Sequence, residues 1–398
     1  MPVAAAKPSA PPHAYGLDAA GLALAERAAR IAREVAAPHA AEVDAKPRFP
    51  TEALDALGKA GFWGLCVPQA LGGLGASPAV FCAVVEELAQ ACASTAMVYV
   101  MHVTAAQMLA ASTTLADREA LLREIAAGRH LTTLAFSEKG SRSQFWAPVS
   151  RLEARGAAFV TDAAKSWVTS ARQAHSYVSS AQKPGATSPM ESTLYLVRRG
   201  TKGIDVVGGF DGLGLRGNDS APVTLQGLAV KSEDLLTAQG GGADGMLGVV
   251  LPWFALGTAA MAAGLCRAAS AATIGHVTGT GFQHTGTGLR DLPNLRARVA
   301  QMSIKTEQTR ALLGHTLAHM AAPSPVTPLF VLQARASALE AAVEVTDLAM
   351  KTCGGAAFSK HLGVERLFRD ARAGWVMAPT IDHLHEFVGR ALVGLPLF

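Results

Sequence analysis

The hydrophobic pattern divides the chain into three parts. Up to about residue 130, apolar residues recur at i, i+3, i+4 and i+7 in segments such as LDAAGLALAERAARIAREVAAPHA, which predicts a helical domain over 15–130. Over 131–238, short runs such as STLYLV and APVTLQGLAV are separated by Gly, Ser, Asp and Pro and predict strands. Long apolar stripes return after the glycines at 240–242 and predict a helical bundle over 239–398. The fold class is therefore α+β.

The strands predict a particular kind of central domain. Their runs are short and evenly spaced, and no long helical pattern lies between them, so a parallel sheet with alternating helices is disfavoured. A small β-barrel or sandwich fits this spacing better.

Two apolar or terminal segments need a separate interpretation. Residues 1–14 are rich in Pro and Ala without the apolar core of a signal peptide, so we expect a disordered tail. The segment from Gly245 to Cys266 is uncharged and long enough to cross a membrane. Because Pro252 lies inside it and Gly and Ala dominate it, we expect instead a helix packed between other helices, and no membrane partner.

Composition narrows the class of protein. A chain of 398 residues, 50% hydrophobic and 17% charged, is globular and too long for a single core. Its 35 basic residues form no run that could follow a nucleic-acid backbone, so we expect no nucleic-acid partner. Five cysteines without a CxxC pair disfavour a disulfide framework and a zinc site, and indicate a reducing compartment, the cytoplasm.

Three motifs have a structural interpretation that we prefer. GLGLRG at 212–217 matches a dinucleotide fingerprint but opens no helix, so we interpret its glycines as turn residues. His315 and His319 stand four residues apart without a third ligand, and we expect them to be solvated or packed in the bundle, so no metal site is predicted. In DHLHE, residues 382–386 point in different directions on a helix and are expected mostly at the surface.

KSWVTSA is a better candidate for chemistry. In a strand, Trp167 and Thr169 face the same side. An aromatic wall beside a hydroxyl group suits a flat heterocycle such as isoalloxazine, although core packing is the ordinary role of such a pair.

Taken in order, four segments resemble the acyl-CoA dehydrogenase family. FPTEALDALGKAGFWGLCVPQALGGLG resembles its N-terminal segment, and LAFSEKGSRSQFW stands in place of its T-E-P-x-x-G-S-D loop. KSWVTSA is similar to its K-x-W-I-T-N strand. CGGAAFSKHLGVERLFRDAR follows its G-G-x-G-x-x-x-x-x-P-x-E-R-x-x-R-D-A pattern without a gap from Gly354 to Ala371. In the second segment Ser143 aligns with the family's serine, and Gly140 with Ser141 offers a rival alignment.

The resemblance implies a fold, a cofactor and a set of site residues. It implies a central β domain between an N-terminal helical domain and a C-terminal four-helix bundle, assembled as a homotetramer or homodimer that binds FAD and an acyl-CoA substrate. The residues that it places near FAD are Leu134, Phe136, Ser137 and Ser143 on the flavin and ribityl side, Trp167 and Thr169 at the ring face, and Gly354, Gly355, Thr380 and Asp382 at the distal nucleotide.

The chain departs from the family where the catalytic base belongs. The family's Y-E-G-T, whose glutamate removes the α-proton, aligns with residues 377–380, so the base position is Ala378. A second family position, in L-D-x-E-R, aligns with 251–255 and has no glutamate either. The family's R-x-x-F-G arginine, which meets the cofactor pyrophosphate, is also missing, although Arg290 is a candidate substitute.

Three hypotheses follow from these departures. The first is an acyl-CoA dehydrogenase with a relocated base, for which Glu138, Asp382 and Glu386 are the candidates. The second is a flavin-dependent monooxygenase of the same fold, which needs no α-proton base. The third is a non-redox lyase or scaffold that keeps the flavin pocket. We predict an FAD-dependent oxidoreductase acting on an acyl thioester, with the monooxygenase as the alternative.

Overall fold

The N-terminal part of the chain is helical. The computed structural model describes residues 13–397, so the predicted tail lies outside the described residues except for its last two positions. Two helices begin with the caps that their sequences encode: the Asp18 carboxylate accepts from the Gly21 N–H at 2.7 Å, and Ser77 caps the helix that starts at Pro78. The helices of this part are α1 (Ala19–Ile31), α2 (Ala37–Ala45), α3 (Thr51–Lys59), α4 (Pro78–Ala91), α5 (Ala93–Ala111) and α6 (Arg118–Ala126).

The central strands form two sheets. One has the order β1-β4-β5, with β1 parallel to β4 and β4 antiparallel to β5; the other is antiparallel with the order β2-β3-β7-β6. The strands are β1 (Thr132–Ala135), β2 (Glu153–Arg155), β3 (Ala158–Val168), β4 (Ser176–Gln182), β5 (Ser192–Arg198), β6 (Ile204–Val206) and β7 (Ala221–Lys231).

The two sheets pack face to face and remain open. Tyr195 and Val197 of β5 meet Val223 and Leu225 of β7 in a shared apolar core. Of the two predicted alternatives the sandwich is therefore correct and the barrel is wrong, because the strands of the described residues form two separate sheets that only isolated bridges, such as Glu138 with Lys165, connect. Strand β2 was not among the predicted runs, since its residues, Glu153 to Arg155, are exposed and largely polar.

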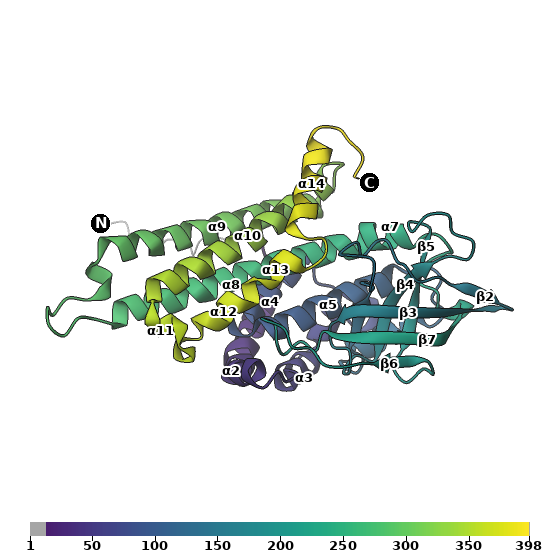
Figure 1. The fold of residues 1–398 in the computed structure, drawn as a ribbon, viewed down its shortest axis with the longest axis horizontal. Coiled ribbons are helices and arrows are strands. Elements are labelled where there is room, and N and C mark those ends of the chain that lie inside the picture. The colour runs from purple at the N-terminus through teal and green to yellow at the C-terminus, as the bar shows by residue number, and fades with distance from the viewer. Residues whose placement is uncertain (1–12, 398) are drawn as a thin grey trace, which may run out of the picture.

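The C-terminal part is again helical. Helices α8, α9 and α10 pack on one another, and α12 and α14 pack on α10 (Figure 1). The elements are α7 (Gly242–Gly245), the π-helical segment Met246–Val250, α8 (Leu251–Gly279), α9 (Pro293–Ala321), α10 (Thr327–Cys353), α11 (Gly355–Phe358), α12 (Val364–Ala371), α13 (Ala373–Val376) and α14 (Ile381–Leu392). The predicted fold class, helical, then sheet, then helical, is confirmed.

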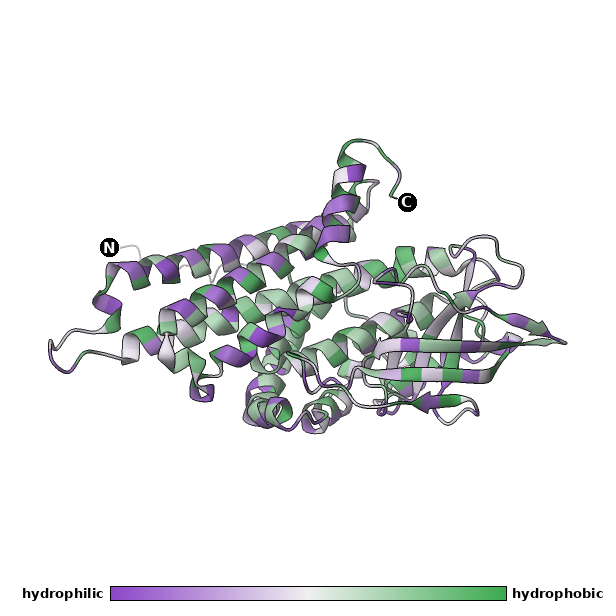
Figure 2. Ribbon diagram, viewed as in Figure 1, coloured by the Kyte–Doolittle hydropathy of each residue, from purple (hydrophilic) through white to green (hydrophobic). Residues whose placement is uncertain are grey.

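Helix α8 is the centre of the molecule. It shows little purple in Figure 2, whereas the outer helix α9 alternates between the two colours. Gly242–Gly279 is long and apolar enough to cross a membrane, yet 72% of its most apolar window is buried inside the structure. Small residues permit this: a Cβ on Gly264 would lie 2.5 Å from the Glu86 carbonyl oxygen on α4. Pro252 follows the π-helical segment, in the first turn of α8, where a proline is tolerated.

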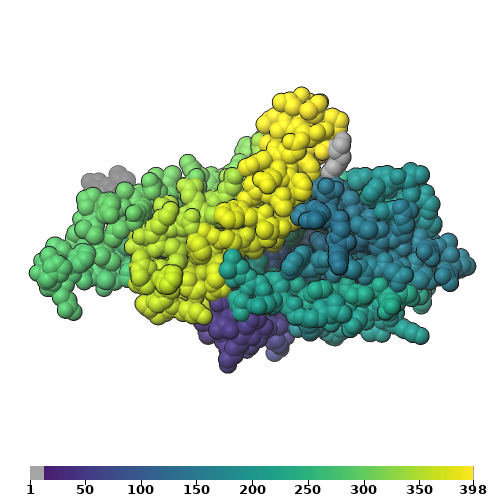
Figure 3. All heavy atoms as spheres, viewed as in Figure 1, coloured from purple at the N-terminus to yellow at the C-terminus, as the bar shows by residue number. Residues whose placement is uncertain are grey.

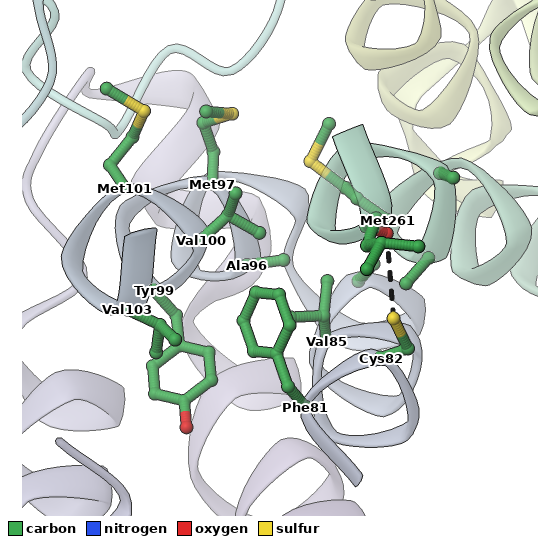
Figure 4. Close-up of a cluster of buried hydrophobic side chains, with 14 of the residues drawn as sticks. Phe81, Cys82, Val85, Ala96, Met97, Tyr99, Val100, Met101, Val103 and Met261 are labelled. Carbon is green, nitrogen blue, oxygen red and sulfur yellow. Dashed lines mark hydrogen bonds between the residues drawn. The ribbon is translucent and has the colours of Figure 1, made fainter. Parts of the chain in front are cut away.

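Helices α4, α5 and α8 share one apolar core, drawn in Figure 4. There the Cys82 thiol lies 3.7 Å from the Leu256 carbonyl oxygen, and the Tyr99 hydroxyl, buried among apolar side chains, donates to the Phe62 carbonyl at 2.8 Å. Tyr99 points from α5 to the side on which Phe81 of α4 lies, and Met97 and Met101 point to the other side. The two methionines therefore remain available to line a site on the sheet side of this helix.

Candidate functional site

A cavity of about 920 Å³ opens where the three parts of the chain meet. Its walls come from α5, from the segment after β1, from the end of β3, from the loop between β6 and β7, from the start of α8 and from the segment α12–α13 with the residues after it. Figure 3 shows the C-terminal segment (yellow) lying across the junction between the bundle (green) and the sheets (blue to teal). A concave, mostly apolar space of this size fits a cofactor together with a small substrate.

Trp167 forms one wall of the cavity. Its side chain is 68% exposed although it belongs to a buried domain junction, and its backbone has φ 56°. The pairing of β3 with β7 is irregular between Lys165 and Val168, and such a bulge re-aims a side chain. Thr169 lies just beyond β3 and also lines the cavity. The two side chains thus share the cavity through a bulge, and the strand alternation that we predicted does not apply.

The segment after β1 supplies hydroxyl groups and positive charge. Leu134, Phe136, Ser137 and Ser143 all line the cavity, together with the basic Arg142. Arg142 and Ser143 have φ 49° and 63°, a left-handed conformation that non-glycine residues adopt at a cost and that clusters at functional sites.

Glu138 lies in this segment and lines the cavity, but its carboxylate is fully engaged. It accepts hydrogen bonds from Lys165 Nζ at 2.6 Å, from the Ser150 hydroxyl at 2.6 Å, and from the N–H groups of Val149 and Ser150 at 2.7 Å each. Burial by itself raises the pKa of the Glu138 carboxyl, but Lys165 and these donors outweigh it and hold the pKa below its ordinary value. A carboxylate held in this way is a poor proton acceptor. Its hydrogen bonds to Ser150 and Lys165 instead hold the segment after β1 in place.

The loop that contains GLGLRG closes one side of the cavity. A Cβ on Gly214 would lie 2.4 Å from the Arg369 carbonyl oxygen, so this glycine permits close approach to α12. The Leu215 N–H donates to the buried Asp370 carboxylate at 2.7 Å, and burial raises the pKa of Asp370 to about 6. The motif therefore joins the sheets to the C-terminal helices, and in this loop it opens no helix.

The two positions of the family's base lie close to one buried cation. Ala378 and Phe254 both line the cavity. The Arg335 guanidinium, on α10, lies over the Phe254 ring at 4.9 Å and donates through Nη2 to the Met377 carbonyl at 3.1 Å. Nε donates to the Thr258 hydroxyl at 3.1 Å, whereas the buried Nη1 has no hydrogen-bond partner among the described residues. Burial lowers the pKa of Arg335 to about 9, which leaves it charged at neutral pH.

Sequence reasoning did not find Arg335. Its signal is present in the chain, because a single arginine interrupts the apolar stripe that runs through Leu332, Ala336 and Leu339 on α10. An arginine on such a stripe is buried or reaches past the core to water, and spacing alone does not tell the two cases apart.

The other predicted site residues lie away from this cavity. Gly354 and Gly355 are at the end of α10, and Thr380 caps α14 by accepting from the His383 N–H. Asp382 lines a separate hollow of about 260 Å³ with Glu340, Trp375 and Ile381. Glu386 is exposed beside Arg390 at 3.4 Å. Of the candidate bases, only Glu138 reaches the cavity in a single chain.

The histidine pair belongs to the bundle. The rings of His315 and His319 are 4.7 Å apart, and the His319 ring stacks on Phe330 at 4.4 Å. No group of three potential metal ligands occurs in the part of the chain that the structure describes.

Comparison with protein-family models gives two matches. The acyl-CoA dehydrogenase N-terminal domain matches residues 20–129, and the acyl-CoA dehydrogenase C-terminal domain matches residues 240–393. The two segments flank the sheets and contribute α5, α8 and α12 to the cavity.

Whole proteins with similar sequences and structures carry the same family name. A probable acyl-CoA dehydrogenase of Mycobacterium bovis is 25% identical over 91% of this chain and 92% of its own length. Cyclohex-1-ene-1-carbonyl-CoA dehydrogenase of Geobacter metallireducens is 26% identical over 91% of this chain and 95% of its own. Butyryl-CoA dehydrogenase from Megasphaera elsdenii superposes with a TM-score of 0.90 at 22% identity, covering 95% of this chain and 99% of that one.

Proposed function

The chain belongs to the acyl-CoA dehydrogenase superfamily, and from that premise we propose that it is an FAD-dependent oxidoreductase that acts on an acyl thioester in the cavity beside Trp167. The strongest support is the exposed Trp167 ring, an aromatic face that a bulge turns into a cavity of about 920 Å³. A flat cofactor that stacks on this ring removes its exposed apolar surface from water.

The hydroxyl groups and the positive charge around Trp167 are suited to bind FAD. Thr169, Ser137 and Ser143 present hydroxyl groups to the same cavity, and Arg142 adds a positive charge suited to phosphate oxygens. We propose that these residues hold the flavin ring and ribityl chain. Gly354, Gly355, Thr380 and Asp382 remain the proposed contacts of the distal nucleotide, which a second copy of the chain would bring to the cavity.

When bound, FAD supplies an acceptor for a hydride from the acyl chain. The chain itself must then accept the α-proton, and Glu138 is the only carboxylate among the described residues that line the cavity. Because that carboxylate is already engaged by Lys165, we propose α,β-dehydrogenation without the family's usual base or a diverted variant of it. Flavin-dependent monooxygenation at the same cavity is the second candidate, since it needs no carboxylate at Ala378 or Phe254. A non-redox lyase or scaffold is the third.

Anaerobic titration with acyl-CoA thioesters tests this proposal. We expect the purified protein to carry or take up FAD, and its flavin to bleach with saturated acyl-CoAs at a rate about 10²- to 10⁴-fold below that of enzymes with a general base. Ala378→Glu restores a carboxylate at the cavity wall and is expected to speed the bleaching. The dehydrogenase assignment is wrong if neither protein bleaches while the chemically reduced enzyme consumes oxygen and releases a hydroxylated product. A protein that remains colourless with FAD and FMN would contradict both redox assignments.

We also propose a homotetramer or homodimer in the cytoplasm. The uncharged stretch of α8 gives no argument for an oligomer, since a single chain buries most of it. Exposed apolar residues on the C-terminal segment support an oligomer instead, because Trp375 is 49%, Val376 72% and Val393 72% exposed. Five free cysteines suit a reducing compartment. Light scattering that finds a stable, flavin-carrying monomer would disprove the oligomer.

A further inference from the structure

Arg335 is a buried charge without a counter-charge. Its side chain has no measurable exposure, and no carboxylate lies within ion-pair distance among the described residues. Three neutral groups contact it, namely the Thr258 hydroxyl, the Met377 carbonyl and the Phe254 ring, and Nη1 is unpaired. A buried guanidinium normally has a carboxylate partner, because desolvation of an isolated charge costs several kcal/mol.

The two arginines of the C-terminal segment beside the cavity follow that rule, whereas Arg142 is exposed to solvent and needs no partner. Arg369 pairs with Asp44 and Glu365 at 2.6 Å each, and Arg372 pairs with Asp347. Both are partly exposed, so they need the partner less than Arg335 does. The unpaired charge is therefore a specific property of Arg335 and not of the surrounding helices.

Arg335 lies next to the wall of the cavity in which we propose that the substrate binds. Phe254 and Met377 line the cavity, and both contact the guanidinium. Arg335 itself does not line the cavity, but its guanidinium lies 4.9 Å from the centre of the Phe254 ring, which does. Contact between a ligand group in the cavity and the guanidinium therefore requires that ring to move aside.

We propose that the missing counter-charge arrives with the substrate, and that the cavity accepts an acyl thioester whose acyl chain carries a carboxylate, bound by Arg335 at the inner end. This inference rests on the proposed thioester function and names its substrate class. The cavity lining is otherwise mostly apolar at this end, with Met97, Met101 and Val250. An ionised carboxylate enters such surroundings only where a cation receives it, and a guanidinium binds carboxylates through two parallel hydrogen bonds.

Matched pairs of thioesters test the proposal on the FAD-loaded protein. The pairs are succinyl- with butyryl-CoA, glutaryl- with valeryl-CoA and adipyl- with hexanoyl-CoA, which differ only in a terminal carboxylate or methyl group. Dissociation constants come from the change that each ligand causes in the flavin spectrum. We expect at least one dicarboxylic ligand to bind about 10-fold more tightly than its partner.

Three variants separate a binding role from a structural one. Arg335→Met removes the charge at similar bulk and should abolish the preference, Arg335→Lys should keep part of it, and Arg298→Met removes a charge that lies on α9 and should leave it unchanged. Arg335→Met should also raise the melting temperature of the ligand-free protein, because the unpaired charge disappears, whereas a purely structural arginine would lower it when lost.

The outcomes distinguish this inference from the proposed function. Equal binding within every pair, or a preference that Arg335→Met leaves intact, would refute the role of Arg335 while the monocarboxylic ligands still demonstrate a thioester site. If no thioester alters the flavin spectrum, the proposed function fails and this inference falls with it.

Discussion

His102 predicts how acid destabilises this fold. It lies on α5 directly after the cavity residue Met101, and its side chain is fully buried. Nε2 donates to the Trp63 carbonyl at 3.0 Å, and Nδ1 accepts from the Thr132 N–H at 3.1 Å, the first residue of β1. Because Nδ1 is an acceptor, only the neutral ring satisfies both contacts. Protonation therefore breaks the contact between α5 and β1, the strand that precedes the cavity-lining segment 136–143.

The magnitude follows from the pKa. Burial lowers the pKa of His102 from 6.5 to about 4, so the folded state favours the neutral ring. That stabilisation is complete above pH 6.5 and is lost as the pH falls toward 4. At pH 5 the loss is about 2 kcal/mol in the free energy of unfolding. For a chain of 398 residues, this corresponds to a fall of about 2 °C in melting temperature.

His102→Gln provides the test, since its amide donates and accepts like the neutral ring and does not titrate. Melting curves at pH 7.5 and pH 5.0, with protein and FAD concentrations held fixed, should show a variant close to the wild type at the higher pH and about 2 °C more stable than it at the lower. His284→Gln, in an exposed loop, is the control and should follow the wild type at both. An unchanged pH dependence in His102→Gln would refute the reasoning.

Three further predictions concern the cavity walls. Trp167→Ala should weaken FAD affinity by about 1 kcal/mol or more through loss of the ring face; unchanged affinity in a fluorescence titration would show that the cofactor lies elsewhere. Lys165→Met should cost about 3–5 kcal/mol in denaturant unfolding by leaving a buried carboxylate unpaired, whereas the double change with Glu138→Gln should recover much of it, and a double variant as unstable as the single one would argue against the pairing. Gly214→Ala should lower the melting temperature through an overlap with the α12 backbone worth about 1–3 kcal/mol, while Gly209→Ala, with open space at its Cβ, should not, and equal effects would contradict the packing.

Sequence patterns were sufficient where periodicity decides the structure. Helical stripes and strand runs located nearly every element of the three parts, because burial of one face dictates those repeats. They missed β2, whose exposed residues carry no apolar alternation. They placed Trp167 and Thr169 on one side of a regular strand; both side chains do line the cavity, but Trp167 reaches it through a bulge at Lys165–Val168 and Thr169 lies beyond the end of β3. A bulge adds a residue without changing composition, so the pattern of hydrophobic positions does not report it.

Contacts between residues far apart in the chain could not be predicted from sequence patterns, for a related reason. Glu138 was a plausible base from its position in the chain, and its four hydrogen bonds became visible only once Lys165 and Ser150 were placed beside it. The same holds for Gly214, whose closeness to α12 joins segments about 150 residues apart.

The absent base and the unpaired arginine describe one feature of the cavity. A carboxylate at position 378 follows Met377, whose carbonyl already accepts from Arg335, and a carboxylate at 254 would occupy the place of the ring under the same guanidinium. An acid at 254 would lie beside the guanidinium and an acid at 378 would adjoin the carbonyl that it binds, so the positive charge of Arg335 would lower the pKa of either acid. This chain keeps the cation and has Ala378 and Phe254 in place of the acids, so an uncompensated positive charge lies behind the part of the cavity wall that these two positions form. A substrate with its own carboxylate neutralises that charge. By the same reasoning, the base that Ala378→Glu adds should be stronger when Arg335 is also replaced, so Ala378→Glu with Arg335→Met should bleach its flavin faster than Ala378→Glu alone, and the reverse order would show that the two side chains do not interact.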